Sequence, residues 1–378
     1  MSYGVAPDCD EIEVTLIGPG FGECCLVHLG GGVWIVVDSC RDRSTGEPAA
    51  LKYLRSIGID PAVAVTMIVV THYHDDHIRG LAELLENCKS ATLCCPAAMD
   101  QREFKVRVGA FTPRVLGSTG AVTREIESML AVVKRRHSRR GRYPIIKALA
   151  DREILVLPSA DSGHGLECRV HTLSPSDKDF DHSMEWLAKE YARMLEPKIR
   201  PPAINPNDFS VALMISIGKT GILLGSDLEA PSDSNRGWNA VLASKSRPQH
   251  ISSVVKIPHH GSENAHSPGM WTKLLFDNPW AILAPYQLGG NVLPEDSDIA
   301  RITSLTSRAY STALRRHRKY KGNRDRSVEK TINESGIKIV KSEPPTGIVR
   351  LRSRSVNNLA PQNWELSHFD GACALADS

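Results

Sequence analysis

The sequence lacks the cysteine pattern of a disulfide-rich protein or of a zinc finger. Its nine cysteines are odd in number, and no two of them have the C-x-x-C spacing. They include two adjacent pairs, Cys24–Cys25 and Cys94–Cys95. Because disulfides are rare where thiols are kept reduced, this pattern favours a reducing compartment.

A membrane span and a secretion signal are also missing from the pattern. No run of about 18 apolar residues occurs in the sequence. Segment 1–13 carries acidic residues and has no apolar stretch of the kind that a signal peptide needs. We therefore expect a soluble cytoplasmic protein that makes no contact with a membrane.

Strong net charge is absent as well. The net charge of +3 is too small to argue nucleic-acid binding by itself, although the positive residues are clustered. With 41% apolar residues, the 378-residue chain is long enough for one large globular domain with insertions. We see no internal repeat and no domain linker, so we predict a single domain over 1–378.

One short stretch, T-H-Y-H-D-D-H over 71–77, is rich in metal-binding side chains. It directly follows the apolar run 66–70. Because side chains alternate along an extended segment, His72 and His74 face the same side and can converge on one ion. Asp76 and His77, at the turn into the next helix, can face a neighbouring ion. A histidine- and carboxylate-rich segment at the end of an apolar strand is typical of a metal site.

Polar residues follow three other apolar segments. Asp38 comes directly after 33–37, Asp227 follows 222–224, and the adjacent histidines His259 and His260 follow 252–257. These histidines follow an apolar segment, as those of the first motif do, so we expect one of them to supply a further nitrogen ligand. The other is then free to act as an acid or to contact a substrate.

The apolar periodicity predicts strands and helices in an α+β order. An antiparallel meander opens the chain, with glycine-rich turns at 18–20 and 30–32. The predicted strands are 12–17, 24–28, 33–37, 66–70, 91–95, 153–157, 167–173, 211–217, 222–224, 252–257, 281–284, 347–352 and 363–366. The predicted helices are 48–57, 78–85, 122–133, 184–195 and 299–310.

Two insertions and a basic tail interrupt this order. The insertions are predicted at about 97–150 and 176–205, and the basic carboxy-terminal segment at about 300–345, with closing strands up to 368. Positive residues gather at the end of the first insertion and in the basic segment. They are either solvated helix faces or contacts to a phosphate backbone. The candidate nucleic-acid contacts are Arg135, Arg136, Arg139, Arg140, Arg315, Arg316 and Arg318.

The motif H-x-H-x-D-H, formed by His72, His74, Asp76 and His77, resembles the signature of the metallo-β-lactamase superfamily. That resemblance implies an αββα sandwich with metals at the rim between two sheets. It also implies that Asp227 bridges two metal ions and that Asp38 supports the metal loop. The superfamily includes lactamases, thioesterases, phosphodiesterases, nucleases and oxidoreductases, so the substrate stays open at this point.

Further motifs resemble one branch of that superfamily. They are N-D-x-S at 207–210, G-S-D-L at 225–228 and K-I-P-H-H-G-S at 256–262. They look like those of the ComEC-like branch, which contains the metallo-hydrolase domain of the bacterial DNA-uptake channel, and of the related phosphorylcholine esterases. The resemblance covers most of 11–285, and the channel's membrane helices have no counterpart here. It implies a free-standing soluble member.

The sequence departs from lactamases and thioesterases, which carry another ligand histidine before the bridging aspartate. Here the corresponding segment offers Asn207, Asp208 and Ser210, while His171 stands in a predicted strand without such a context. This departure leaves Asp208 as a candidate oxygen ligand, and an oxygen-richer site accepts Mn²⁺ as readily as Zn²⁺.

The implied metal ligands are His72, His74, Asp76, His77, Asp227, His260 and Asp208, with His259 as the open alternative to His260. Asp38 and Ser210 are expected to support them from behind. Asp76, His259, His260 and Lys256 are the candidate catalytic residues.

The ligand set implies hydrolysis of a phosphodiester with two divalent ions, Zn²⁺ or Mn²⁺. In that mechanism His259, His260 or the cation of Lys256 assists the leaving oxygen. The leading hypothesis is a nuclease acting on DNA or RNA, with a protein partner in a defence or DNA-processing system as a further expectation.

Two alternatives stay open. In the first, the substrate is a small phosphodiester, such as a cyclic nucleotide or a choline phosphate. In the second, the protein is a non-catalytic partner-binding module in which the metal has a structural role. A deep pocket with aromatic walls would favour the small substrate, and Trp186, Trp238, Trp271 and Trp280 are candidates to line one.

Overall fold

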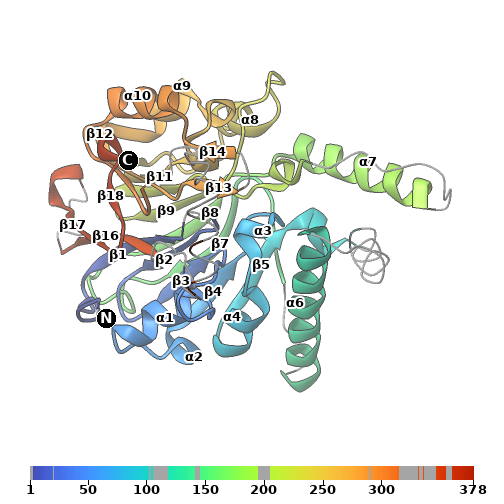
Figure 1. Ribbon diagram of the computed structural model, residues 1–378, viewed down its shortest axis with the longest axis horizontal. Coiled ribbons are helices and arrows are strands. Elements are labelled where there is room, and N and C mark those ends of the chain that lie inside the picture. The colour runs from blue at the N-terminus through green and yellow to red at the C-terminus, as the bar shows by residue number, and fades with distance from the viewer. Residues whose placement is uncertain are drawn as a thin grey trace.

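The computed structural model contains two large sheets that face each other (Figure 1). It describes residues 3–19, 21–101, 104, 118–140, 145–194, 205–288, 291–314, 331, 335, 346–354 and 360–378. The first sheet contains β1 (Ile12–Gly18), β2 (Cys24–His28), β3 (Trp34–Val37), β4 (Val65–Val69), β5 (Thr92–Pro96), β6 (Ile146–Ala148), β16 (Gly347–Ser353) and β17 (Glu365–Phe369). Its strand order is β17-β16-β1-β2-β3-β4-β5-β6.

The second sheet is built from the later part of the chain. It contains β7 (Arg152–Leu157), β8 (Cys168–Thr172), β9 (Leu213–Ile217), β10 (Thr220–Leu224), β11 (Ile251–Lys256), β12 (Leu275–Leu283), β15 (Ala309–Ser311) and β18 (Cys373–Ala374). Its order is β18-β15-β12-β11-β10-β9-β8-β7. A separate hairpin pairs β13 (Tyr286–Leu288) with β14 (Asn291–Leu293).

Helices cover the outer faces of both sheets (Figure 1). On the first sheet lie α1 (Ala49–Ser56), α2 (Pro61–Ala64), α4 (Leu81–Asn87) and α6 (Ser118–Arg140). On the second lie α8 (Gly237–Ala243), α9 (Pro268–Leu274) and α10 (Asp296–Leu305). The short α3 (Asp75–Ile78) carries the end of the histidine motif, and α7 (Asp177–Met194) extends away from the sandwich.

Alternating side chains divide the buried core into three layers. In β1, Ile12, Val14 and Leu16 pack between the sheets, whereas Ile17 faces the helices of the first sheet. In β9, Ile215 packs between the sheets and Met214 faces α8 and α9. This period-2 pattern is what a sheet covered on both faces requires. The αββα sandwich is therefore confirmed.

Most predicted elements are present with ends that shift by a few residues. The opening meander is antiparallel, as expected. The helix predicted over 78–85 is wrong at its start, because Gly80 adopts a φ of +84° and separates α3 from α4. The helix predicted over 299–310 ends at Leu305, and Ala309–Ser311 forms β15 beside β12.

The predicted insertion over 97–150 contains a strand. β6 pairs in parallel with β5 and forms the edge of the first sheet. Elements that the sequence pattern did not predict include α2, α8, α9, the β13–β14 hairpin and β18. Within the described ranges, no helix is long and apolar enough to cross a membrane.

The topology brings the polar strand ends together. β3 and β4 are parallel neighbours, and so are β10, β11 and β12. Carboxyl ends of parallel strands meet at one edge of a sheet, so the loops after these five strands share the rim of the sandwich. These loops carry Asp38, the histidine motif, Asp227, the His259–His260 pair and Ala284.

His28, at the end of β2, makes stability depend on pH. Burial lowers the pKa of this imidazole to about 4, and its Nε2 accepts a hydrogen bond from the Gly32 amide at 3.1 Å. The unfolded state has a pKa of about 6.5, so it binds the proton first as the pH falls.

We predict that the metal-free protein loses up to about 3 kcal/mol of unfolding free energy between pH 6.5 and pH 4 because of His28. Urea unfolding across this range, for wild type and His28→Gln, measures the effect. The variant should show a shallower loss, whereas parallel curves for the two proteins would contradict the assignment.

Candidate metal centre

Two groups of donor side chains lie side by side at the rim between the sheets. The first contains His72, His74 and Asp227, and the second contains Asp76, His77 and His260. Within each group the ligand atoms lie within 4.8 Å of one another. Both groups are almost completely buried, so the sequence motifs after β4, β10 and β11 do converge in space.

Asp227 belongs to the first group and also lies against two histidines of the second. Its Oδ2 lies 3.8 Å from His72 Nε2, 3.3 Å from His77 Nε2 and 3.5 Å from His260 Nε2. The Nε2 of His72 is 3.0 Å from His74 Nδ1. Ligand atoms around a tetrahedral zinc ion are about 3.3–3.4 Å apart, because each bond is about 2.0–2.1 Å long. These separations therefore suit side chains that converge on common ions.

Asp38 orients the ligands from behind. Its Oδ2 lies 2.7 Å from His77 Nδ1 and accepts a hydrogen bond from Thr71 Oγ1 at 2.7 Å. Since the Thr71 hydroxyl donates its single proton to Asp38, it accepts from His72 Nδ1 at 2.9 Å. One carboxylate thus fixes both rings with Nε2 turned toward the centre, which is how metal-binding histidines are commonly held.

The geometry separates His259 from His260. His260 Nδ1 lies 2.8 Å from the Ala284 carbonyl oxygen, so its Nε2 faces Asp76 Oδ2 at 3.2 Å and Asp227 Oδ2 at 3.5 Å. His259 instead lies between Asn264 and Asn207 and belongs to neither donor group. Both histidines have positive φ values, 47° and 54°, which splay the two rings.

A buried atom without a hydrogen-bond partner supports the fit of these residues to metal ions. His77 Nε2 is buried and has no hydrogen-bond partner among the described residues. Buried polar groups without partners are costly, and a divalent ion satisfies such groups directly. Histidine nitrogen and carboxylate oxygen are the donor types that Zn²⁺ and Mn²⁺ accept. The donor set therefore fits two divalent ions.

Electrostatics differ between the two groups. Burial lowers the pKa of His72 and of His74, so both rings favour the neutral form that binds metal. Burial would also lower the pKa of His77, but Asp227, Asp76 and Asp38 outweigh it and raise that pKa. In the metal-free protein, the second group thus holds positive charge against its carboxylates.

Asp208 lies away from the donor groups. Its carboxylate accepts a hydrogen bond from Arg236 Nη2 at 2.6 Å and lies 3.5 Å from His182 Nε2. Its neighbour Asn207 is 5% exposed and has a side-chain oxygen without a partner among the described residues. In this segment, the oxygen free to bind a ligand therefore belongs to Asn207.

Ser210 is buried behind this segment, and its hydroxyl has no partner in the described part of the chain. The backbone amide of Val211 donates to the Thr71 carbonyl oxygen at 3.1 Å, which ties the segment to the histidine motif. His171 lies in β8, 3.7 Å from Glu153, and belongs to neither donor group.

The basic clusters contribute little to the described site. Arg136 donates to the carbonyl oxygens of Cys88 and Ala91 at the end of α4, and Arg135 pairs with Glu86. The side chains of Arg139, Arg140, Arg315, Arg316 and Arg318 lie outside the described residues. Trp238 and Trp271 fill the core beside α8 and α9 and line no described pocket at the site.

Sequence reasoning missed two polar residues of the centre. Glu23 precedes β2 and is 3% exposed, and Thr71 connects Asp38 to His72. The position of Glu23 beside an apolar strand was the available signal. An aromatic pair at the rim, Phe21 and Tyr286, was also missed because its members are distant in sequence.

Comparison with known families supports the fold. Residues 17–144, from the end of β1 through α6, match the family model of the metallo-beta-lactamase superfamily. The protein has the metallo-beta-lactamase fold. The matched segment contains Asp38 and the complete histidine motif of this fold. No curated protein gives a significant match to the chain.

Solved structures of the metallo-beta-lactamase fold resemble the chain at low identity. The fold protein YhfI from Bacillus subtilis is 12% identical with a TM-score of 0.39, covering 81% of this chain and 97% of its own. MIM-2 metallo-beta-lactamase is 13% identical with a TM-score of 0.32, covering 66% and 75%. The di-zinc enzyme LRA-12 from an Alaskan soil metagenome is 12% identical with a TM-score of 0.32, covering 60% and 64%. These likenesses assign no substrate.

We predict that Asp38→Asn weakens metal binding by about 10- to 100-fold, because His77 and Thr71 lose the charged acceptor that orients them. Competition with a chelating dye measures the affinity for Zn²⁺. Asp75→Asn is the matched control, since the Asp75 carboxylate in the same motif binds Arg79 at 2.9 Å instead. Equal affinities for the two variants would contradict the role of Asp38.

Proposed function

We propose that the protein is a metal-dependent phosphodiesterase that acts on nucleic acid. The observation that carries the proposal is the position of Asp227 Oδ2 between the two donor groups, 3.8 Å from His72 Nε2 of the first and 3.3 Å from His77 Nε2 of the second. Two adjacent sites bridged by one carboxylate suit in-line displacement at phosphorus, because the attacking and leaving oxygens need stabilisation together.

Residues around the two donor groups would have distinct roles in this reaction. Two bound divalent ions would lower the pKa of a water molecule to roughly 7 and offset charge on the phosphoryl oxygens. Asp227 would hold the centre together, while Asp38 and Thr71 keep His72 and His77 in place. His72 and His74 cannot act as bases, since their inward-facing nitrogens belong to the donor group.

His259 is the histidine available for proton transfer. It lies outside the donor groups, and its side chain is 17% exposed, whereas that of His260 is 3% exposed. Its Nδ1 lies 2.9 Å from Asn264 Oδ1 and its Nε2 lies 3.2 Å from Asn207 Nδ2, and these two contacts fix the ring. We assign to His259 the proton that assists the leaving oxygen.

The sequence motifs support a nucleic-acid substrate over a lactam. N-D-x-S at 207–210 stands where lactamases carry a ligand histidine, and it resembles the ComEC-like branch. The carboxylates of Asp76 and Asp227 make the centre rich in oxygen donors, which supports Mn²⁺ as well as Zn²⁺. A protein partner in a defence or DNA-processing system remains a prediction.

An aromatic rim supports recognition of a nucleobase. The Tyr286 ring lies 5.5 Å from the His260 ring and 5.5 Å from that of Phe21, and the Arg79 guanidinium lies 4.5 Å over Phe21. Phe21 and Tyr286 are partly exposed, and Arg79 is exposed. Aromatic faces beside a cation are typical of sites that stack bases next to a phosphate.

The same rim favours a second candidate, hydrolysis of a small phosphodiester such as a cyclic nucleotide. The described arginines of the basic clusters bind neighbouring protein groups, whereas the rim lies beside the donor groups. A rim of two aromatic rings and one cation suits a single base as well as a base within a strand. Parallel assays with single-stranded DNA, RNA and cyclic nucleotides separate the two candidates.

We predict that the purified protein hydrolyses nucleic acid with Mn²⁺ or Zn²⁺ and that Asp227→Asn and His72→Ala abolish this activity. Fluorescently labelled DNA and RNA report cleavage, and His171→Gln is the control because it lies away from both donor groups. Intact nucleic acid with every metal tested would contradict the proposal, and full activity of Asp227→Asn would contradict the site.

We also predict that Phe21→Leu and Tyr286→Leu raise KM for a base-bearing oligonucleotide by about 5- to 100-fold, since a stacked base contributes about 1–3 kcal/mol. An abasic oligomer of the same length keeps the backbone and removes the bases. Its KM should not change, and Tyr286→Phe should behave like wild type. An equal loss on both substrates would contradict base stacking.

A further inference from the structure

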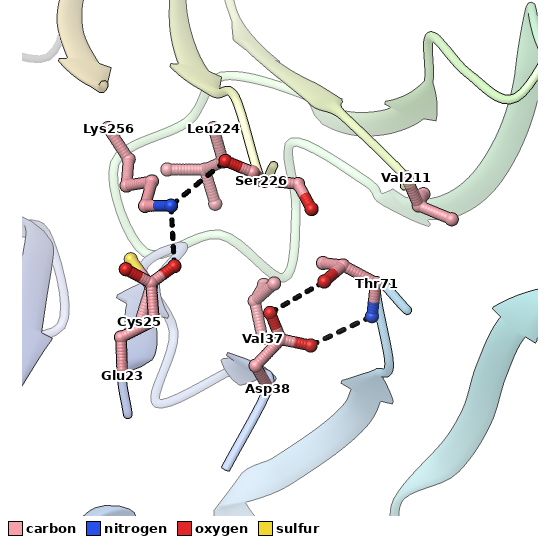
Figure 2. Close-up of a pocket in the computed structure, with 9 residues that line it drawn as sticks. All are labelled: Glu23, Cys25, Val37, Asp38, Thr71, Val211, Leu224, Ser226 and Lys256. Carbon is pink, nitrogen blue, oxygen red and sulfur yellow. Dashed lines mark hydrogen bonds and ion pairs between the residues drawn. The ribbon is translucent and has the colours of Figure 1, made fainter. Parts of the chain in front are cut away.

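Lys256 is a buried cation whose role the proposed mechanism leaves open. It is the last residue of β11, and its side chain is 3% exposed. Its Nζ lies 2.5 Å from Glu23 Oε1 and donates to the Ser226 carbonyl oxygen at 2.9 Å (Figure 2). Glu23 directly precedes β2 of the first sheet and Lys256 ends β11 of the second, so this pair connects the two sheets.

The surroundings of Lys256 separate it from a substrate. It faces a small cavity between the sheets, lined by Glu23, Cys25, Val37, Asp38, Thr71, Val211, Leu224 and Ser226. In Figure 2 the amino group points at Glu23 and at the backbone of Ser226. A cation enclosed in this way cannot donate a proton to a leaving group at the rim, so its effect must pass through its neighbours.

One neighbour is the bridging carboxylate. Lys256 Nζ lies 3.5 Å from Asp227 Oδ1, while Asp227 Oδ2 faces His72, His77 and His260. The two oxygens thus have separate surroundings, a cation on one side and ligand nitrogens on the other. Attraction between Nζ and Oδ1 fixes the rotation of the carboxylate that presents Oδ2 to both donor groups.

The backbone that carries Asp227 is held by the same lysine. Ser226 has a φ of +50°, a conformation that non-glycine residues rarely adopt. Its carbonyl oxygen accepts hydrogen bonds from Lys256 Nζ at 2.9 Å and from the His259 amide at 2.9 Å. The Gly225 amide also donates to the Lys256 carbonyl oxygen at 3.0 Å. Lys256 therefore holds the turn as well as the carboxylate.

The other neighbour is a competing ligand. Glu23, His77 and Asp227 form a third group that can hold a metal ion. The Glu23 amide donates to the Asp76 carbonyl oxygen at 2.9 Å, so Glu23 is fixed beside the motif. With Lys256 bound to Glu23 Oε1, a positive charge already occupies the space between Glu23 and Asp227, and His77 Nδ1 is bound to Asp38.

We propose that Lys256 is a positioning residue of the metal centre. Its buried pair with Glu23 holds Asp227 so that Oδ2 alone faces both donor groups, and it keeps Glu23 from acting as a ligand. This inference rests on the proposed two-ion centre and assigns Lys256 no contact with the substrate. It replaces the role in leaving-group assistance that the sequence predicts for Lys256.

The test compares four forms of the full-length protein. Lys256→Met removes the cation and leaves the Glu23 charge buried, which can prevent folding. Lys256→Met combined with Glu23→Gln removes both charges and keeps their approximate volume. Lys52→Met is the control, because it breaks a lysine–carboxylate pair of 2.9 Å with Asp42 that lies away from the donor groups.

The readouts are Zn²⁺ stoichiometry and affinity, by competition with a chelating dye, and the visible spectrum of the Co²⁺-loaded protein. We expect the double variant to fold, to bind at least one ion about 10- to 100-fold more weakly and to show an altered Co²⁺ spectrum. The control should match wild type.

Two results would overturn the inference. The first is a double variant that binds two ions with the affinity and spectrum of wild type. The second is a double variant with normal metal content whose hydrolysis loses only the alkaline limb of its pH profile, because that result would make Lys256 an acid. The metal measurements decide the inference even if the wild type hydrolyses no nucleic acid, and that failure would count against the proposed function alone.

Discussion

The structure depends on placing several negative charges out of water where two sheets meet. Glu23, Asp38, Asp76 and Asp227 are each at most 5% exposed. Isolated buried carboxylates are strongly disfavoured, so each one needs a cation or a set of donors. Histidine rings, Thr71 and Lys256 supply part of this compensation. Divalent ions held by the two donor groups would supply the rest.

The residues that touch the centre were largely predictable from the sequence. His72, His74, Asp76, His77, Asp227 and His260 each follow an apolar strand, and the ends of parallel strands meet at one edge. The choice between His259 and His260 was not predictable, because it depends on positive backbone φ values at both residues and on the Ala284 carbonyl. The position of Asp208 away from the donor groups was not predictable either, because its partner Arg236 lies 28 residues away in sequence.

The fold was predictable for the same reason. The prediction was wrong where a single residue changes the course of the backbone. Alternating apolar residues in β1 and β9 gave the sandwich, whereas Gly80 interrupted a continuous helical pattern. Lys256 shows most clearly what the sequence does not predict. A lysine in the same short motif as two histidines suggests a catalytic cation, yet its long side chain extends between the sheets to Glu23. The direction of a side chain is set by its tertiary neighbours and not by the motif that contains it.

The central claim is a centre for two ions that share one oxygen of Asp227. Anomalous scattering from crystals of the zinc- or manganese-loaded protein tests it most directly. The account predicts two peaks about 3.5–4 Å apart. One peak should lie against His72 and His74, the other against Asp76, His77 and His260, with Asp227 Oδ2 between them. A single peak, or a peak bound by Glu23 in place of the His72–His74 pair, would contradict it.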